Sequence, residues 1–230
     1  MKLKIKALLI FVIFIVKITY SQEIGIKIGS NSDIYKSSSS NQYIKPHATV
    51  GLENLQVYYL HTLNEHLKLE TGLSFKYYMY SINYTTTNTK GYYTFDHNWG
   101  VPINLNYEIQ LKKLKAYFYS GISIVFNENN STTEITSQKD GYPVSYQTKI
   151  NFSSEALGLS VNNGLGCKYQ FSNWSVGIGM EFVHYLSNYY TFKTEIMNLQ
   201  SGEIQLFEST STGDYLGFYL TLSKSFSFNK

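Results

Sequence analysis

The sequence predicts an all-β protein, an eight-stranded antiparallel up-and-down transmembrane β-barrel with short periplasmic turns and long extracellular loops. Three observations lead to this prediction. Apolar residues alternate with small or polar residues over most of the chain, which is the pattern of β-strands with two different faces. Short and long connections alternate between these segments. The composition also suits strands, because aromatic residues make up 17% of the chain and only 3 residues are proline.

Eight segments carry the period-two pattern. They are residues 24–29, 48–63, 67–79, 95–108, 114–126, 157–171, 174–186 and 215–228. Most of them reach the roughly 9 to 11 residues that cross the hydrocarbon core of a membrane at a tilt, and the first is short. The alternation changes phase near Glu53 and Asn54, which predicts a β-bulge there. Pro102 lacks an N–H group, so we expect a local irregularity around it.

The connections predict the topology. Residues 64–66, 110–113 and 172–173 are tight turns, whereas residues 30–45, 85–94, 127–156 and 187–213 are long connections. Both chain ends fall on the side of the short turns. Strict alternation of this kind, with an even number of strands, is typical of outer-membrane barrels. The sheet must close on itself because backbone groups in hydrocarbon need internal partners.

The polar face of the strands predicts a filled lumen. It carries many glycines together with charged residues, and an eight-stranded barrel has an interior that alternating large and small side chains can fill. The expected lumen charge network consists of Lys68, Glu70, Lys76, Glu108, Lys115, Lys168 and Glu181. Charges in such an interior must pair, so we expect them to hold the barrel shut. A path for protons or small solutes is the alternative.

Aromatic residues on the apolar face predict that this face meets lipid. They gather toward the two ends of the strands, as two girdles at the membrane interfaces would require. The girdle residues are Tyr107, Tyr169, Phe171, Trp174, Phe226 and Phe228 on the short-turn side, with Tyr77, Phe95 and Trp99 on the other. Cys167 is expected on this face as a small apolar residue. The alternative is a soluble lipid carrier with a lipocalin-like barrel.

Residues 1–21 have the layout of a cleaved secretory signal peptide, with early lysines, an apolar run and small residues before a predicted cleavage between Ser21 and Gln22. A membrane anchor is the alternative. Four of the 19 lysines lie in this segment, which leaves 15 lysines against 16 acidic residues and a net charge of −1. This charge offers no argument for nucleic-acid binding. The domain predicted for residues 22–230 is the barrel, located in the outer membrane.

Several features together resemble the small outer-membrane barrels that are common in Bacteroidetes, the PorT-like or porin-type group. They are the signal ending in YSQE, the early GIKIGSN at residues 25–31, the eight alternating strands and the closing GFYLTLSKSFSF at residues 217–228. Asn229 and Lys230 depart from this pattern, because such barrels often end on an aromatic residue. The resemblance implies, as a narrower alternative, an accessory role in protein secretion across the outer membrane.

No catalytic motif, cofactor site or metal site is expected. The five histidines, among them His61 and His66 across one turn, are too scattered for a convincing metal site. We therefore expect a non-enzymatic barrel that contacts outer-membrane lipid and presents its long connections to a protein partner or for envelope integrity. Parts of residues 127–156 and 187–213 are alternatively expected to continue the strands as a protruding sheet. An enzyme acting at the rim would need Asp96, His97 and His184 to converge.

Overall fold

The computed structural model describes residues 22–37, 44–48, 52–84, 89–127, 131–138, 145–154, 156–186, 190–199 and 201–226. The predicted signal peptide, including Ser21, lies outside these residues, and Gln22 begins the first strand. The described strands are β1 (Gln22–Ser37), β2 (Ile44–Ala48), β3 (Leu52–Thr62), β4 (Leu67–Tyr84), β5 (Thr89–Leu111), β6 (Leu114–Asn127), β7 (Ser131–Gln138), β8 (Ser145–Ser154), β9 (Leu157–Phe171), β10 (Trp174–Tyr185), β11 (Tyr190–Asn198) and β12 (Ile204–Phe226). None of the described residues belongs to a helix that is long and apolar enough to cross a membrane.

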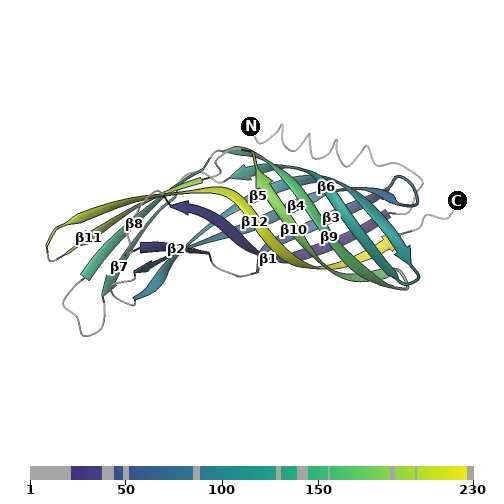
Figure 1. Ribbon diagram of the computed structural model, residues 1–230, viewed down its shortest axis with the longest axis horizontal. Coiled ribbons are helices and arrows are strands. Elements are labelled where there is room, and N and C mark those ends of the chain that lie inside the picture. Colours follow the sequence, from purple (N-terminus) through teal and green to yellow (C-terminus); the bar gives the residue numbers. More distant parts are fainter. Residues whose placement is uncertain are drawn as a thin grey trace.

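Eight of the described strands close into an antiparallel barrel, as predicted (Figure 1). They follow the order β1-β3-β4-β5-β6-β9-β10-β12, and pairing of β1 with β12 completes the ring. The closing pair begins where Gln22 lies opposite Phe226, at the same end of the barrel as the tight turns. Each barrel strand therefore has two hydrogen-bonded neighbours, which leaves no free edge in the barrel wall.

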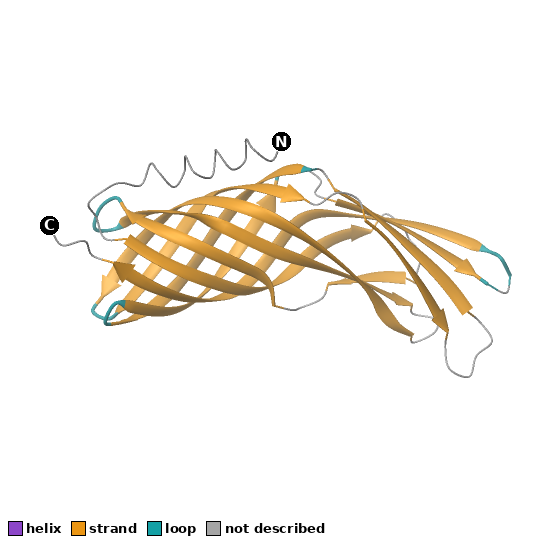
Figure 2. Cartoon of the chain, turned by 180° about the vertical axis from the view of Figure 1, so that it is seen from behind, coloured by secondary structure: helices purple, strands orange, loops and turns teal. Residues whose placement is uncertain are grey.

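The tight turns lie at one end of the barrel, which we call the short-turn end (Figure 2). Between β3 and β4, the side-chain oxygen of Asn64 accepts hydrogen bonds from the backbone N–H groups of His66 and Leu67 at 2.9 and 2.8 Å. Two-residue turns join β5 to β6 and β9 to β10. They begin at Lys112 and Ser172, which have positive φ angles of 59° and 55°. The predicted positions of these turns are confirmed.

A sheet protrudes beyond the other end of the barrel. It consists of β7, β8, β11 and residues 204–211 of β12, in the order β12-β11-β8-β7. Residues 127–156 and 187–213 are the long connections expected from the sequence, and of the two expectations for them, polar loops or strands that continue as a protruding sheet, the described residues follow the second. Period-two alternation of apolar and polar residues weakens here because the two faces no longer meet such different surroundings, while the ladder of backbone hydrogen bonds continues outward from the barrel.

The strand boundaries differ from the prediction in the second segment. The predicted segment 48–63 falls on two described strands that both pair with β4, β2 ending at Ala48 and β3 beginning at Leu52, and residues 49–51 lie outside the described ones. The predicted bulge is confirmed: Gly29 pairs with Asn54 and Ser30 pairs with Leu52, which leaves Glu53 as the extra residue. The irregularity at Pro102 is also confirmed, since the β4–β5 ladder skips the pairs around it and resumes in the same register.

Apolar side chains face outward from the barrel and polar ones face inward, which confirms the predicted orientation. In β1, Ile24, Ile26 and Ile28 are 43–49% exposed, whereas Glu23 and Lys27 are 4% and 3% exposed. The same alternation continues around the wall. On β9, Cys167 lies on the outward face, two positions from exposed Leu165 and two from exposed Tyr169. A protein in water would show the opposite distribution.

Most of the predicted girdle residues lie exposed at the ends of the outward face. Tyr107, Tyr169, Phe171, Trp174 and Phe226 surround the short-turn end, and Tyr77 and Trp99 lie toward the protruding sheet. The side chains of Phe95 and Phe228 lie outside the described ones. Two aromatic belts thus bound a mainly aliphatic band, in which exposed Phe118, Phe182 and Phe218 are exceptions, and membrane interfaces favour such belts.

Tyrosines and glycines fill the middle of the barrel in cross-strand pairs. The pairs are Tyr58 with Gly25, Tyr117 with Gly166, Tyr119 with Gly164 and Tyr219 with Gly179. A Cβ atom at any of these glycines would overlap the opposing tyrosine side chain. These positions must therefore be glycine, because any larger residue would clash with the opposing tyrosine. The four tyrosine side chains fill the part of the lumen that the glycines leave open.

Candidate functional site: the charged lumen

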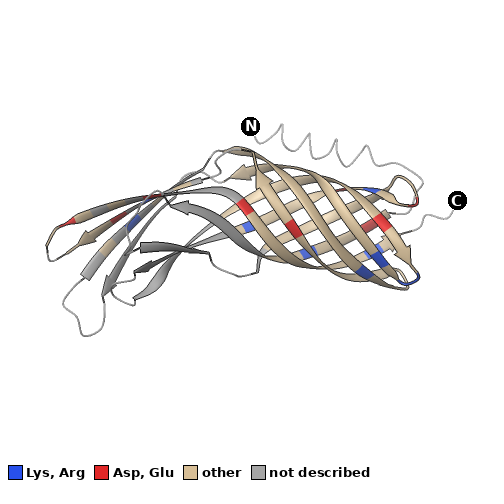
Figure 3. Cartoon of the chain, in the orientation of Figure 1, with Lys and Arg blue, Asp and Glu red and all other residues tan. Residues whose placement is uncertain are grey.

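The interior of the barrel gathers the predicted charged residues and two others (Figure 3). Glu70, Lys76, Glu108, Lys168 and Glu181 are 4–6% exposed. Lys68 and Lys115 lie on the same face and are partly exposed. The lumen network predicted from the sequence left out Glu23, which lies just before the predicted strand 24–29, and Lys27, which lies within it. The signal was present, since both residues alternate with Ile24, Ile26 and Ile28.

Four charged residues form a compact cluster near the short-turn end, which we call the lower ion cluster. It consists of Glu23, Lys68, Glu108 and Lys168. Lys168 Nζ lies 3.0 Å from Glu23 Oε1 and 3.6 Å from Glu108 Oε1. Lys68 Nζ lies 3.7 Å from Glu23 Oε2 and also contacts Glu108. Each lysine thus bridges the same two glutamates, and the four formal charges cancel.

A second group, the central ion cluster, consists of Lys27, Glu70 and Glu181. Lys27 Nζ lies 3.7 Å from Glu70 Oε1 and 3.8 Å from Glu181 Oε2. It also donates a hydrogen bond to Tyr119 Oη at 3.3 Å. One lysine therefore serves two buried carboxylates, so neutral donors must supply the rest of their stabilisation.

Amide and phenol groups provide those donors. Glu70 accepts hydrogen bonds from the side-chain amides of Gln56, Asn104 and Asn106, at 3.0 to 3.4 Å. Glu181 accepts hydrogen bonds from Tyr119 Oη at 2.7 Å, Asn54 Nδ2 at 3.0 Å and Tyr215 Oη at 3.2 Å. A buried carboxylate with several donors is far less costly than an unpaired one.

A layer of tyrosines lies between the two clusters. Lys168 Nζ is 5.1 Å from the ring centre of Tyr117, and Lys27 Nζ is 4.7 Å from that of Tyr219. Tyr117 Oη donates to Tyr219 Oη at 3.1 Å. Lysines on both sides thus contact aromatic faces, which favour cations. The ion clusters and the rings together occupy the lumen from the short-turn end to its middle.

A small polar chamber lies above the central cluster, toward the protruding sheet. Its volume is about 40 Å³, and Lys76, Asn98, Glu181 and Tyr215 are among its lining residues. Lys76 Nζ lies 3.9 Å from the ring centre of Tyr215. At roughly 10–15 Å³ for each water, this space suits about three water molecules rather than an organic ligand. Among the described residues, no group of three or more potential ligand side chains could hold a metal ion.

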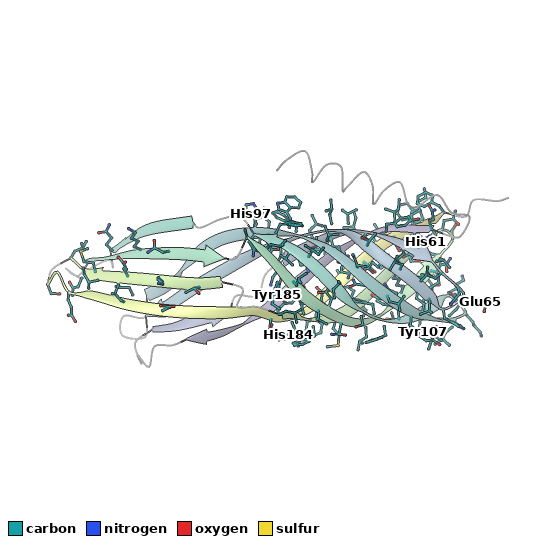
Figure 4. The ribbon with its side chains drawn as sticks, turned by 90° about the horizontal axis from the view of Figure 1, so that it is seen from above. His61, Glu65, His97, Tyr107, His184 and Tyr185 are labelled. Atoms are coloured by element: carbon teal, nitrogen blue, oxygen red, sulfur yellow. The ribbon has the colours of Figure 1, made fainter. Side chains whose placement is uncertain are left out.

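Of the three residues considered for a rim enzyme, the two whose side chains are described lie apart. The ring of His97 lies 5.4 Å from that of Phe75, whereas His184 Nδ1 lies 3.0 Å from Asp214 Oδ2. Figure 4 shows His97 and His184 on opposite sides of the barrel. The side chain of Asp96 lies outside the described ones. The two described histidines therefore do not converge on a common substrate position.

The histidines of the β3–β4 turn are also separate. His66 Nδ1 lies 3.1 Å from the carbonyl oxygen of Glu108, and its ring lies 5.6 Å from that of Tyr107. His66 thus turns toward β5, while His61 is the register partner of Leu69 on β4.

The chain matches no family model and no curated protein. Solved structures resemble it in fold. The outer membrane protein OprG from Pseudomonas aeruginosa matches over 91% of this chain and 97% of that one, at 8% identity and a TM-score of 0.52. A major outer membrane protein from Thermus thermophilus matches over 88% and 99%, at 13% identity and a TM-score of 0.45. The likeness to OprG identifies an outer-membrane barrel fold, and the PorT-like resemblance stays a prediction.

Proposed function

We propose that this protein is a non-enzymatic integral barrel of the outer membrane, with a closed lumen and a protruding sheet that binds a partner outside the cell. The observation that carries the proposal is the inverted distribution of side chains. Leu220 and Leu165 are 62% and 53% exposed on the barrel wall, while Lys27 and Glu70 are almost fully buried in the lumen. Hydrocarbon is the solvent in which this arrangement is stable.

The filled lumen argues for a role that does not depend on transport. Within each ion cluster, lysines and glutamates form ion pairs with one another, and the tyrosine layer separates the two clusters. The remaining chamber of about 40 Å³ is too small for an organic solute. The activity of this protein would therefore reside at its outer surface, where loops and extensions of a rigid scaffold commonly bind partners.

The protruding sheet is the part of the described structure best suited to binding. Its β11–β12 hairpin carries exposed apolar residues, with Ile204 at 56% and Leu206 at 71% exposed. These two residues are two positions apart on one strand and share a face, and a contiguous apolar patch on a surface in contact with water commonly marks an interaction site. The accessory role in secretion that the sequence resemblance implies would use the same surface, with a subunit of a secretion machinery as the partner.

The proposal is tested by locating the two ends of the barrel in cells. An epitope tag inserted after Gly202, which has open space around it, should bind antibody on intact cells. A matched tag in the Ser172–Asn173 turn should bind antibody only after the outer membrane is permeabilised. Both proteins should be found in the outer-membrane fraction and should migrate differently in SDS gels before and after boiling, as a closed barrel does.

Recovery of the protein in the soluble periplasmic fraction, without a heat-dependent shift, would contradict the proposal. Equal antibody access to both tags on intact cells would contradict the proposed orientation. A deletion variant that lacks the protruding sheet but keeps the heat-dependent shift would be the protein to compare with the full chain in binding studies. Such a variant should no longer capture the partner that the full chain captures.

A further inference from the structure

A hydrogen-bonded polar pair lies on the outward face of the barrel wall. Ser120 is near the middle of β6 and Asn163 is near the middle of β9, and the two residues are register partners. Ser120 Oγ donates to Asn163 Oδ1 at 2.9 Å. The surrounding outward-facing residues are apolar and 42–53% exposed: Leu105, Phe118, Ile122, Leu165 and Phe182.

This pair is costly in a wall that faces hydrocarbon. The Asn163 side chain accepts from Ser120, but its Nδ2 group forms no hydrogen bond within the described part of the chain. An amide N–H without a partner in an apolar medium is strongly disfavoured. Histidines on the outward face, such as His97 and His184, lie near the rim, where water can reach them. Asn163 lies near the middle of its strand, away from both rims.

From this placement we propose that Ser120 and Asn163 form the centre of an interface through which two copies of the barrel associate in the membrane. The inference rests on the proposed function, because it requires the wall to be embedded in lipid. It adds a second copy of this chain as a partner within the membrane, distinct from a partner bound at the protruding sheet.

Symmetry makes a second copy the occupant that fits best. Copies inserted in the same direction are related by a two-fold axis along the membrane normal, so a residue beside that axis meets its own counterpart at the same depth. An asparagine side chain carries both a donor and an acceptor, so two Asn163 amides can satisfy each other. The bulky residues around the pair, including Phe118 and Leu165, would exclude lipid from these hydrogen bonds.

The opposite wall supplies a matched control. β1 and β3 lie across the barrel from β6 and β9 in the strand order. Ile26 and Val57 are register partners there, just as Ser120 and Asn163 are on the proposed interface. Val57 is near the middle of its strand and 51% exposed, and its two register partners, Ile26 and Leu73, are apolar.

The experiment measures association of the fluorescently labelled full-length protein in lipid vesicles at increasing protein-to-lipid ratios, by single-molecule photobleaching. The wild-type protein should form dimers. Asn163→Leu should weaken dimerisation by roughly 3- to 30-fold, the range expected for a hydrogen bond between membrane segments. Val57→Leu should change nothing. Because Asn163→Leu makes the wall more apolar, the heat-dependent shift in SDS gels should persist.

Cross-linking gives a second measurement in the native membrane. In a Cys167→Ala background, Asn163→Cys should form a disulfide-linked dimer under mild oxidation, and Val57→Cys should not. A folded wild-type barrel that stays monomeric would overturn the inference while leaving the proposed function intact. Unchanged dimerisation of Asn163→Leu, or cross-linking of Asn163→Cys to a different protein, would also overturn it. Absence of the heat-dependent shift in the wild-type protein would overturn the proposed function, and this inference with it.

Discussion

Lys168 illustrates how single residues hold the lumen together. It is 4% exposed, and its Nζ contacts carboxylates from two different strands, Glu23 of β1 and Glu108 of β5. The same Nζ lies near the rings of Tyr58 and Tyr117, at 5.6 and 5.1 Å from their centres. Its loss would leave two buried glutamates with Lys68 as their single remaining lysine contact in the cluster.

We expect Lys168→Met to lower the free energy of unfolding by about 3–5 kcal/mol, because it leaves buried charge without its partner. Urea unfolding of the barrel in lipid vesicles, followed by tryptophan fluorescence, measures the change. Lys113→Met, in an exposed turn, is the control and should stay within about 0.5 kcal/mol of the wild type. The double variant Glu23→Gln with Lys168→Met should recover part of the loss. Equal stability of the Lys168 and Lys113 variants would contradict a structural role for the cluster.

At the scale of elements, β12 passes through two environments. Residues 215–226 form part of the barrel wall against β1, whereas residues 204–211 belong to the protruding sheet. Leu220 in the first part and Leu206 in the second are similarly exposed, at 62% and 71%. Their solvents differ under the proposed function, since one leucine would face hydrocarbon and the other water.

This difference predicts opposite tolerance to a charge on the same strand. Leu220→Lys should destabilise the inserted barrel by about 2–4 kcal/mol, the cost of a lysine at the lipid-facing midplane. Leu206→Lys should change stability by less than about 0.5 kcal/mol. Urea unfolding in vesicles and the heat-dependent gel shift report both effects. If the two substitutions were equally harmless, the barrel wall would not face lipid.

At the scale of the whole molecule, the described part of the lumen contains two ion clusters, a tyrosine layer and a small polar chamber. These layers follow one another along the barrel axis, so a solute would have to displace the lower cluster, the rings and the central cluster in turn. The contacts of the rings and of the central cluster join strands that are far apart in the chain, whereas Lys68 and Glu108 lie on the consecutive strands β4 and β5. Lys168 and Glu23, also in the lower cluster, are separated by 145 residues.

We therefore expect the folded protein to be closed to solutes. Vesicles containing the purified barrel should swell in isotonic sugar solution no faster than protein-free vesicles, because the lumen is filled with paired charges and packed rings. Vesicles with a known porin provide the positive control for the assay. Swelling of the barrel-containing vesicles at a rate near that of the porin would contradict a closed lumen.

Local patterns in the sequence predicted the barrel because a wall between lipid and a polar lumen imposes period-two alternation on each strand separately. Turn residues such as Ser172 and Asn173, the bulge at Glu53 and the inward position of Lys168 all follow from neighbours close in the chain. The sequence left open whether the long connections form polar loops or a protruding sheet, because residues 131–154 lack that alternation.

Contacts between distant strands depended on register, which local patterns do not specify. Tyr119 fits opposite Gly164, and Ser120 meets Asn163, because β6 pairs with β9 across the β7–β8 excursion. A shift of one residue would turn these side chains to the other face. The sequence by itself accordingly shows which residues face the lumen and which face outward. Closure of the barrel decides which charges, aromatic rings and polar groups meet, because strand pairing is a property of all eight strands together.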